Sequence, residues 1–459
     1  MTPSALRPAR PTLPAARSPR GRLLQVLGVA FGLAVIVGNT ILVGILRTPG
    51  DVAARLPDPG LFLGIWLAGG IYALLGALSL AEPGAMVAGS GGQYVFVRRG
   101  LGEYPGFVVG WSDWISTSAS LSAGAMVFAE YLEPLVPAST GRGTGVACGV
   151  VALFGLLHWR GIRIGDLSQQ MLSALKTACF AALIAACLFL PVPPGDRPAP
   201  AAVPTGAALF GAVIAALQSV IYTYDGWTGP IYFGEEVKHP GRDIPRAMAG
   251  GVVLVTAIYL LLNLALVRVL GVGAMAGDPF VAATAGRLLF GGRGDLVIRL
   301  LVLVAILGGL NALTLMVSRV PLAMSRDRLL PARFASVNRG GTPTVAHWAS
   351  VAITVGFIAS GTFGTVLAIA AFFFVANYAL SFASVFALRW REPATPRPYR
   401  VPGYPWTTGL VLAGSLAFLA GAVASDWGTS WKSLLLLGAS YPAYRAVCWV
   451  RSREASGAP

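Results

Sequence analysis

Charged side chains are scarce in this chain, and lysine is almost absent. Only 12% of the 459 residues are charged, about half of the roughly 25% that is typical of soluble domains. The three lysines are Lys176, Lys238 and Lys432. So few charges cannot cover the surface of a soluble protein of this length. The composition therefore disfavours a cytosolic enzyme, a disordered chain and a disulfide-rich secreted module.

Cysteine and histidine are also few, and their spacing matches no metal site. The four cysteines lie in or beside apolar runs without a C-x-x-C pair, and the three histidines are far apart. This spacing predicts apolar packing rather than redox chemistry or metal binding. A phosphate-binding G-x-x-x-x-G-K-[ST] loop is missing as well, which disfavours direct coupling to ATP. We expect a protein that is not an enzyme and that holds no cofactor and no metal.

Apolar residues make up 55% of the chain, and the mean hydropathy is +0.70. Most of the apolar segments reach the roughly 20 residues that cross a bilayer as a helix. Helices satisfy their own backbone polar groups in lipid, so the pattern predicts an all-α integral membrane protein with about twelve transmembrane helices. The expected helices cover residues 24–46, 60–83, 105–132, 143–158, 169–191, 207–233, 248–270, 296–320, 344–361, 363–388, 407–424 and 431–450.

The net charge of +15 by itself is typical of proteins that bind nucleic acid or an acidic surface. When the expected helices alternate across a membrane, however, 24 of the 34 basic residues fall on one side and nine on the other. Cytoplasmic segments are enriched in Lys and Arg. The charge thus predicts a topology in the cytoplasmic (inner) membrane, with both termini cytoplasmic and no nucleic-acid partner. Residues 1–22 are expected to be a disordered basic tail, and 451–459 a second cytoplasmic tail.

Two of the expected helices contain residues that interrupt a helix. Val35–Gly50 contains glycines, Asn39 and Thr40 within an apolar run, and Leu217–Glu236 contains Asp225-Gly226 and Gly229-Pro230. Broken helices at corresponding places in two halves indicate a midplane site of a transporter. Where a helix is interrupted, backbone amides without a partner attract a carboxylate, and backbone carbonyls without a partner accept hydrogen bonds from an ammonium. Two interruptions that face each other would therefore suit a zwitterionic amino acid. The alternative is that these glycines only allow close helix packing.

Ionisable residues inside the expected helices are candidates for coupling. Lys176 is the only lysine in a span; it could replace a structural sodium ion or bind protons, or it could lie near the cytoplasmic end with its ammonium at the membrane surface. Asp113 lies close to the start of its expected helix, so a functional role is less favoured. Glu82 and Glu130 fall near span ends, where an interfacial position is expected.

Four segments resemble the amino acid–polyamine–organocation (APC) superfamily of permeases, and most closely its L-type amino-acid transporter branch. The resemblance covers essentially everything after the tail. The segments are GNTILVGILRTPG (Gly38–Gly50), SGGQYVFVRRGLG (Ser90–Gly102), YTYDGWTGPIYFGEEVKHPGRDIPRAM (Tyr222–Met248) and SRVPLAMSRDRLLPARFASVNRGGTP (Ser318–Pro343).

The resemblance implies a five-plus-five inverted repeat with discontinuous first and sixth helices. Residues 23–191 would form the first repeat with spans 1–5, and 207–388 the second repeat with spans 6–10. Spans 11 and 12, in 405–450, would lie outside the two repeats.

The resemblance also implies a substrate site at the first break. There, backbone amides of Ile41, Val43 and Gly44 would bind the substrate carboxylate. Lys176 aligns with the fifth-span lysine thought to stand where related folds place sodium.

At the second break the resemblance assigns the amino group to the carbonyls of Tyr222, Thr223 and Asp225. Tyr222 also aligns with the aromatic residue that covers the substrate. These contacts offer no partner for a charged side chain, so the expected cargo is a neutral amino acid.

The sequence departs from the family pattern at Leu42, where relatives carry a small residue, and at Pro83. Leu42 could narrow the pocket, change the substrate or abolish transport. Two hypotheses follow: a secondary transporter that moves amino acids by alternating access, or a transport-inactive homologue that acts as an amino-acid sensor or partner-binding subunit. A membrane enzyme is disfavoured. The preferred amino acid, coupling to protons or to a counter-transported amino acid, and the oligomeric state are left open.

Overall fold

The computed structural model describes residues 23–42, 44–193, 198–360, 363–425 and 427–456. In these ranges the chain is helical, with only isolated β-bridges outside the helices. The predicted tail at 1–22 and residues 194–197 lie outside the described residues. The α-helices are α1 (Val29–Thr40), α2 (Gly44–Arg55), α3 (Pro59–Met86), α4 (Gln93–Leu101), α5 (Glu103–Leu132), α6 (Gly143–Trp159), α7 (Ile162–Phe189), α8 (Gly206–Thr223), α9 (Pro240–Leu270), α10 (Val272–Met275), α11 (Val281–Phe290), α12 (Gly294–Val317), α13 (Arg319–Arg326), α14 (Thr344–Ser360), α15 (Phe363–Arg391), α16 (Trp406–Ser425) and α17 (Trp427–Ser456).

Each of the twelve expected apolar segments contains one of these helices. By length and apolar composition, six helices in the described part of the chain could cross a membrane, or seven if α1 and α2 form one bent span. A total of twelve spans therefore stays a prediction. Three short helices, α4, α11 and α13, lie wholly or mostly outside the twelve expected segments and are too short to cross a membrane.

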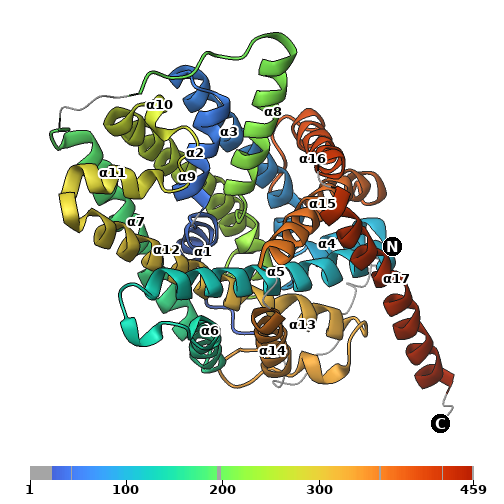
Figure 1. Ribbon diagram of the computed structural model, residues 1–459. Helices are drawn as coiled ribbons and strands as arrows, with labels where there is room; N and C mark the ends of the chain where they lie inside the picture. Colours follow the sequence, from blue (N-terminus) through green and yellow to red (C-terminus); the bar gives the residue numbers. More distant parts are fainter. Residues whose placement is uncertain (1–22, 43, 194–197, 361–362, 426, 457–459) are drawn as a thin grey trace, which may run out of the picture.

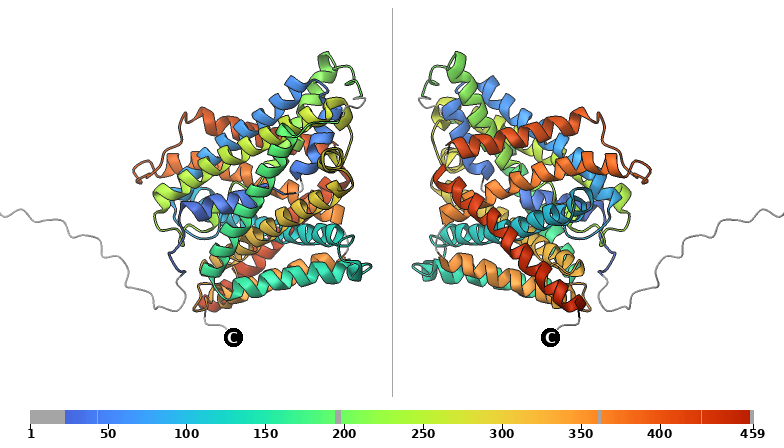
Figure 2. Two further views of the ribbon diagram at one scale, coloured as in Figure 1. Left: turned by 90° about the vertical axis from the view of Figure 1, so that its left-hand side faces the viewer. Right: turned by 90° about the vertical axis from the view of Figure 1, so that its right-hand side faces the viewer.

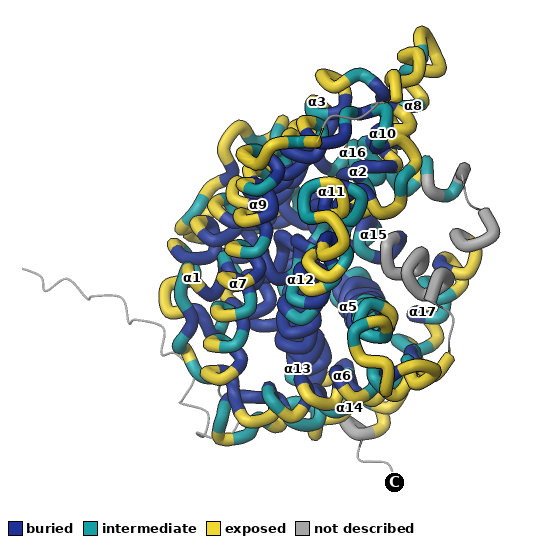
Figure 3. The backbone as a smooth tube through the Cα atoms, turned by 60° about the vertical axis from the view of Figure 1, so that its left-hand side comes forward, coloured by how far each residue is buried: buried dark blue, intermediate teal, exposed yellow. Residues whose placement is uncertain are grey.

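The distribution of side chains is the reverse of that in a soluble protein. Several large apolar side chains on the outer surface are between 61% and 84% exposed: Leu153, Leu167, Met171, Phe189, Phe210, Trp390 and Trp406. Lys176, Glu236 and Arg319, by contrast, are at most 1% exposed. Exposed segments lie on the periphery and buried ones in the centre (Figure 3). An apolar periphery around buried charges is expected where lipid, rather than water, surrounds the helices.

The centre of the molecule is formed by α1, α5 and α12. α12 packs against α1, α5 and α7, as can be followed in Figure 1. α3 packs along α9. Figure 2 shows how the long helices cross. Nearly all of α12 from Leu301 to Val317 is buried. This places the two interrupted segments of the sequence in the interior, next to the most buried helix.

Glu82 does not have the interfacial position that its place near a span end predicted. It is 2% exposed and accepts two hydrogen bonds from Arg389, at 2.8 and 2.5 Å. Arg397 lies 3.2 Å away, and the amide of Val401 donates to Glu82 at 2.7 Å. The expectation was wrong because α15 supplies Arg389, and the segment after α15 folds back over the end of α3 and supplies Arg397 and the Val401 amide. Glu82 thus joins α3, α15 and the segment that leads into α16.

We predict that Glu82→Gln destabilises the fold, because it leaves Arg389 and Arg397 without their shared anion. The expected loss in the free energy of unfolding in detergent is about 3 kcal/mol. The matched control is Glu392→Gln, which removes an exposed ion pair with Arg99, 2.7 Å apart with side chains 39% and 25% exposed. That change should cost about 0–1 kcal/mol. Equal losses for the two variants would contradict the account of Glu82.

Candidate functional site

Two helices end inside the protein, at the places where the sequence is interrupted. α1 ends at Thr40 and α2 starts at Gly44, with a 51° bend between them. α8 ends at Thr223, and turns lead from there to a short 3-10 helix, η2 (Gly229–Tyr232). Because helix ends leave backbone amides and carbonyls without intrahelical partners, both places present polar backbone in the interior.

Gly226 allows the two helix ends to approach each other. Its φ of +119° is a conformation that other residues rarely adopt, and a Cβ there would lie 2.8 Å from Oγ1 of Thr40. The side-chain amide of Asn39 donates to the Gly226 carbonyl at 3.3 Å. A glycine at this position is therefore needed for the close approach as well as for the turn.

Tyr259 on α9 connects the two helix ends. Its hydroxyl lies 2.9 Å from the Thr40 carbonyl oxygen and 3.1 Å from that of Thr223. The side chains of Thr48 and Thr223 are also hydrogen bonded, at 2.9 Å. These contacts hold the end of α1, the start of α2 and the end of α8 in one arrangement.

Three residues on one face of α7 satisfy carbonyls near the end of α1. Lys176 donates to the carbonyls of Gly38 and Ile41 at 3.0 and 2.6 Å, and Gln169 and Ser173 donate to another carbonyl one turn earlier in α1. Lys176 is fully buried. A Cβ at position 308 of α12 would lie 2.9 Å from its Cε, so a glycine there makes room for the lysine.

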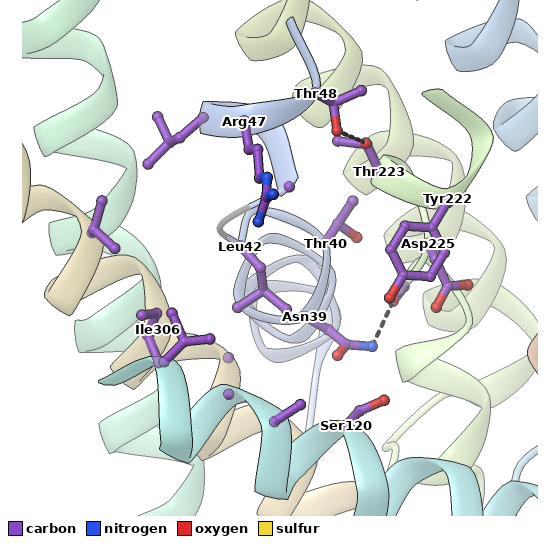
Figure 4. A pocket seen from close by; sticks show the side chains of 18 of the residues that line it. Asn39, Thr40, Leu42, Arg47, Thr48, Ser120, Tyr222, Thr223, Asp225 and Ile306 are labelled. Atoms are coloured by element: carbon purple, nitrogen blue, oxygen red, sulfur yellow. Dashed lines mark hydrogen bonds between the residues drawn. The ribbon is translucent and has the colours of Figure 1, made fainter. Parts of the chain in front are cut away.

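A cavity of about 890 Å³ opens next to the two helix ends, between α2, α5, α11 and α12. Figure 4 shows side chains of the α1–α2 break on one side of it, with Tyr222, Thr223 and Asp225 on the other. One wall is polar and is lined by Asn39, Thr40, Thr48, Thr117, Tyr222, Thr223, Asp225 and Thr228. The rest of the lining includes apolar side chains, among them Leu42, Val302, Ile306, Leu310 and Leu313.

The predicted residues Gly44, Tyr222, Thr223 and Asp225 line this cavity. The Tyr222 side chain is 38% exposed. The amide of Asp225, two residues after Thr223, donates to the Tyr222 carbonyl at 3.1 Å in a turn. The carboxylate of Asp225 is hydrogen bonded to the hydroxyl of Tyr378 on α15. The structure therefore brings the sixth-segment residues and Gly44 to one cavity.

The remaining predicted residues lie elsewhere. Ile41 is fully buried and is not part of the cavity wall. Its amide donates to the Val37 carbonyl at 3.2 Å. Lys176 lies behind α1 rather than in the cavity wall, and Val43 lies outside the described residues.

Leu42 lines the cavity without closing it. Its Cδ2 occupies the position next to Gly309 of α12, where a Cβ would lie only 2.2 Å away. The larger residue in the first break is therefore matched by the smallest residue on the facing helix. The sequence analysis identified Leu42 as a departure but could not pair it with Gly309, which lies far away in the chain.

Sequence reasoning also missed Asn39 as a contact of the second break, together with Tyr259 and Tyr378. The two tyrosines occur in long apolar helices, where single tyrosines are common, so no local pattern distinguishes them. Their roles follow only from the positions of α9 and α15 beside the breaks.

One end of the cavity carries charged side chains and the opposite end is closed. Arg47, Glu130 and Arg299 belong to the first end, formed by α2, the end of α5 and the start of α12. Met316 is the last residue of α12 in the cavity wall. One turn beyond it, Arg319 and Glu236 form a fully buried ion pair, 3.1 Å apart.

Further ion pairs surround that closed end. Arg326 contacts Glu235 at 2.7 Å, and Asp327 is 3.0 Å from Arg98 and accepts from the Tyr94 hydroxyl at 2.7 Å. These contacts connect α4 and α13 with the segment after η2. In the described ranges, no group of three or more His, Cys, Asp or Glu residues could hold a metal ion, and the four cysteines are unpaired.

Comparison with known proteins gives a single family. A family model described as amino acid permease matches residues 23–438. The serine/threonine exchanger SteT of Bacillus subtilis (strain 168) is 31% identical over 444 residues, covering 95% of this chain and 98% of that protein.

Human transporters are more distant relatives. The b(0,+)-type amino acid transporter 1 is 26% identical over 389 residues, which cover 83% of this chain and 79% of that protein. The Asc-type amino acid transporter 1 is 28% identical over 400 residues, covering 85% and 76%. The resemblance seen in the sequence is confirmed, and the chain belongs to the amino acid permease family.

Proposed function

We propose that the protein is a secondary transporter that moves neutral amino acids across the cytoplasmic membrane by alternating access. The observation that carries this proposal is the cavity beside two facing helix ends. The similarity to the exchanger and the two transporters supports it. Transport of this kind is not an enzymatic activity.

The start of α2 supplies the site for a carboxylate. Its first residues, Gly44 to Leu46, have amides without intrahelical partners, and Gly44 and Leu46 line the cavity. The first turn of α2 contains no acidic side chain, so the positive end of the helix dipole is free for an anionic group. Arg47 extends from α2 toward Leu42 (Figure 4) and adds a positive charge. The family resemblance assigned three backbone amides to the carboxylate. We propose that those of Val43 and Gly44 bind it, because the amide of Ile41 already donates to the Val37 carbonyl.

The end of α8 supplies the site for an ammonium. The backbone of Tyr222, Thr223 and Asp225 borders the cavity, and helix C-termini favour cations. Tyr259 holds the Thr223 carbonyl in place. Tyr222, whose ring is exposed to the cavity, would cover the bound amino acid.

The walls around these two ends favour a neutral side chain. The wall formed by Leu42, Ile306 and Leu310 is apolar. At the charged end, Arg299 is paired with Asp295 at 2.5 Å. An additional charge on the substrate would therefore face an apolar wall without a partner, which is costly.

Alternating access requires that the closed end of the cavity, beyond Met316, can open. For release on the opposite side, the Arg319–Glu236 pair and the contacts of Asp327 would have to separate. The distribution of basic residues assigns this end to the cytoplasm. The cavity would then be open to the outside, and both termini would be cytoplasmic.

We also propose twelve spans in two inverted repeats, 23–191 and 207–388, with 405–450 outside them. A helix in each of the twelve expected segments supports this, as does the position of each break in the first helix of its repeat. The transport-inactive alternative depended on Leu42. Its packing beside Gly309, with the cavity still open, removes that support.

The proposal is tested in proteoliposomes with labelled L-serine, L-threonine and L-leucine, with and without the same amino acid inside. Uptake stimulated by internal amino acid, or driven by an ion gradient, is the expected result. If the native protein neither binds nor transports any amino acid while a Leu42→Gly variant transports one, the transporter hypothesis fails.

We predict that Gly309→Ala lowers uptake about tenfold, since its new methyl group would meet Leu42 and displace it into the cavity; overpacking of this kind costs about 1–3 kcal/mol. The double variant with Leu42→Gly should recover most of the activity. Gly356→Ala on α14, where a Cβ meets nothing within 4 Å, is the control. Additive losses in the double variant would contradict the pairing.

Lys176→Ala should reduce uptake at least tenfold while the protein remains folded and inserted. The variant leaves the carbonyls of Gly38 and Ile41 without their donor beside the first break, and a buried unpaired group costs about 1–3 kcal/mol. Uptake across pH 5–8 and size-exclusion profiles are compared with those of Lys432→Ala, which changes an exposed lysine. Unchanged uptake in the Lys176 variant would remove this residue from the mechanism.

Replacing Tyr222 with Ala should raise the apparent KM for the transported amino acid, because the ring that covers the cavity is lost. Tyr222→Phe keeps the ring and should behave like the native protein. Both are measured by initial uptake rates over a range of concentrations, and an unaltered KM in the alanine variant counts against a covering role.

A further inference from the structure

Asp113 on α5 is a carboxylic acid buried directly behind the cavity wall. It is fully buried, about three turns into the helix. Its neighbours Thr117 and Tyr232 belong to the cavity wall, whereas Asp113 does not. This place in the helix is close to the predicted one, but the full burial puts Asp113 deep in the protein.

The partners of Asp113 are hydroxyl groups. The Tyr232 hydroxyl lies 2.8 Å from both carboxylate oxygens, and Thr117 donates to one of them at 3.3 Å. No salt bridge of the described residues includes Asp113, whereas the buried acids Glu82 and Glu236 each have an arginine. An ionised carboxylate without a cation is costly in such an environment.

The geometry suits a carboxyl group that carries a proton. A tyrosine hydroxyl has a single hydrogen to donate, and a neutral carboxyl group has one as well. With both hydrogens present, each of the two 2.8 Å contacts has its own hydrogen: the carboxyl donates to the tyrosine oxygen, which donates to the other carboxyl oxygen.

The charged and titratable groups on the elements around α5 leave Asp113 without a cation. One group that interacts electrostatically with Asp113 is another acid, Asp225. The hydroxyl of Tyr378 on α15 is hydrogen bonded to Asp225. Between Arg299 and Arg319, α12 has no charged side chain. The arginines on these elements are each close to another acid: Arg98 of α4 to Asp327, Arg319 of α13 to Glu236, Arg389 of α15 to Glu82 and Arg451 of α17 to Glu103. The tyrosines Tyr94 of α4 and Tyr444 of α17 are hydrogen bonded to Asp327 and Glu103. Of the histidines, His347 of α14 is hydrogen bonded to the Gly155 carbonyl, and His158 of α6 stacks on Phe154.

Tyr232 belongs to the closed end of the cavity. Its carbonyl accepts from the amide of Gly91 at 3.2 Å, and its ring lies so close to Gly92 that a Cβ there would be 2.7 Å from it. Opening this end requires η2 and the segment before α4 to move relative to α5. That movement separates Tyr232 from Asp113 and admits water, which stabilises the ionised carboxylate.

We propose that Asp113 is a proton-binding site of the transport cycle, loaded while Tyr232 closes this end and emptied to the opposite side when Tyr232 leaves. The inference rests on the proposed transport by alternating access. It makes the proton a co-substrate: one proton bound at Asp113 on the side where the cavity is open is released on the other side together with the amino acid.

The test uses proteoliposomes that contain a pH-sensitive dye and receive labelled L-threonine, L-serine or L-leucine. For the native protein we expect the amino acid to carry protons inward and its net uptake to increase when the outside is more acidic. Asp113→Asn keeps the shape of the side chain but cannot lose a proton. It should abolish the proton movement and the response to the pH gradient, while exchange of labelled for internal amino acid continues.

Ser112→Ala is the matched control, because Ser112 is the buried neighbour that bonds Asn377 and not Asp113; it should keep proton movement. Tyr232→Phe retains the ring and removes the hydroxyl, so the pH of half-maximal uptake should shift. Proton movement that persists in Asp113→Asn, or an unshifted profile in Tyr232→Phe, overturns the inference. If the native protein exchanges amino acids without moving protons, only this inference fails; if it transports none of the three, the proposed function fails with it.

Discussion

A helix that ends at membrane depth leaves backbone amides and carbonyls that no water can satisfy, and the centre of this protein is organised around that constraint. The Tyr259 hydroxyl lies within hydrogen-bonding distance of a carbonyl from each of the two interrupted helices. Lys176 satisfies two more carbonyls from behind. By contrast, Gly44 and Leu46 in the first turn of α2 line a cavity, and the amides of a first helical turn have no intrahelical partner. The amides of this turn are available to an anionic group, and the carbonyls at the end of α8, each with a second lone pair, can still accept from a cation beside it.

Four carboxyl groups of the interior divide into two classes according to their partners. Glu82 and Glu236 are matched by arginines that connect separate helices, so they contribute to the closed arrangement. Asp225 and Asp113 are matched by tyrosine hydroxyls instead. Asp225 lines the cavity, and Asp113 lies directly behind its wall. A hydroxyl can accept as well as donate, so these two positions tolerate a change in protonation that an arginine pair would oppose.

Much of the fold was predictable because apolar runs of about 20 residues and glycine interruptions are local features of the sequence. All twelve segments contain helices, and the break at Gly226 coincides with a positive φ. The partners across the site were not predictable, since Tyr259, Tyr378 and Gly309 are distant in the chain and unremarkable in composition. Glu82 was misjudged for the same reason: its arginines come from the end of α15 and from the segment after it, both distant in the chain. Ile41 shows the limit of a backbone assignment by resemblance, because its amide already has a partner.

The central claim is that the two facing helix ends hold the carboxylate and the ammonium of one amino acid. Calorimetric titration of the purified protein with L-threonine, its methyl ester and its N-acetyl derivative tests this most directly. If the uptake measurements identify L-serine or L-leucine as the substrate, that amino acid and its two derivatives take the place of threonine. The parent amino acid should bind, and each derivative should bind at least about tenfold more weakly, because hydrogen bonds to charged groups contribute about 1.5–3 kcal/mol. If either derivative binds as tightly as the parent amino acid, the two helix ends are not the substrate site.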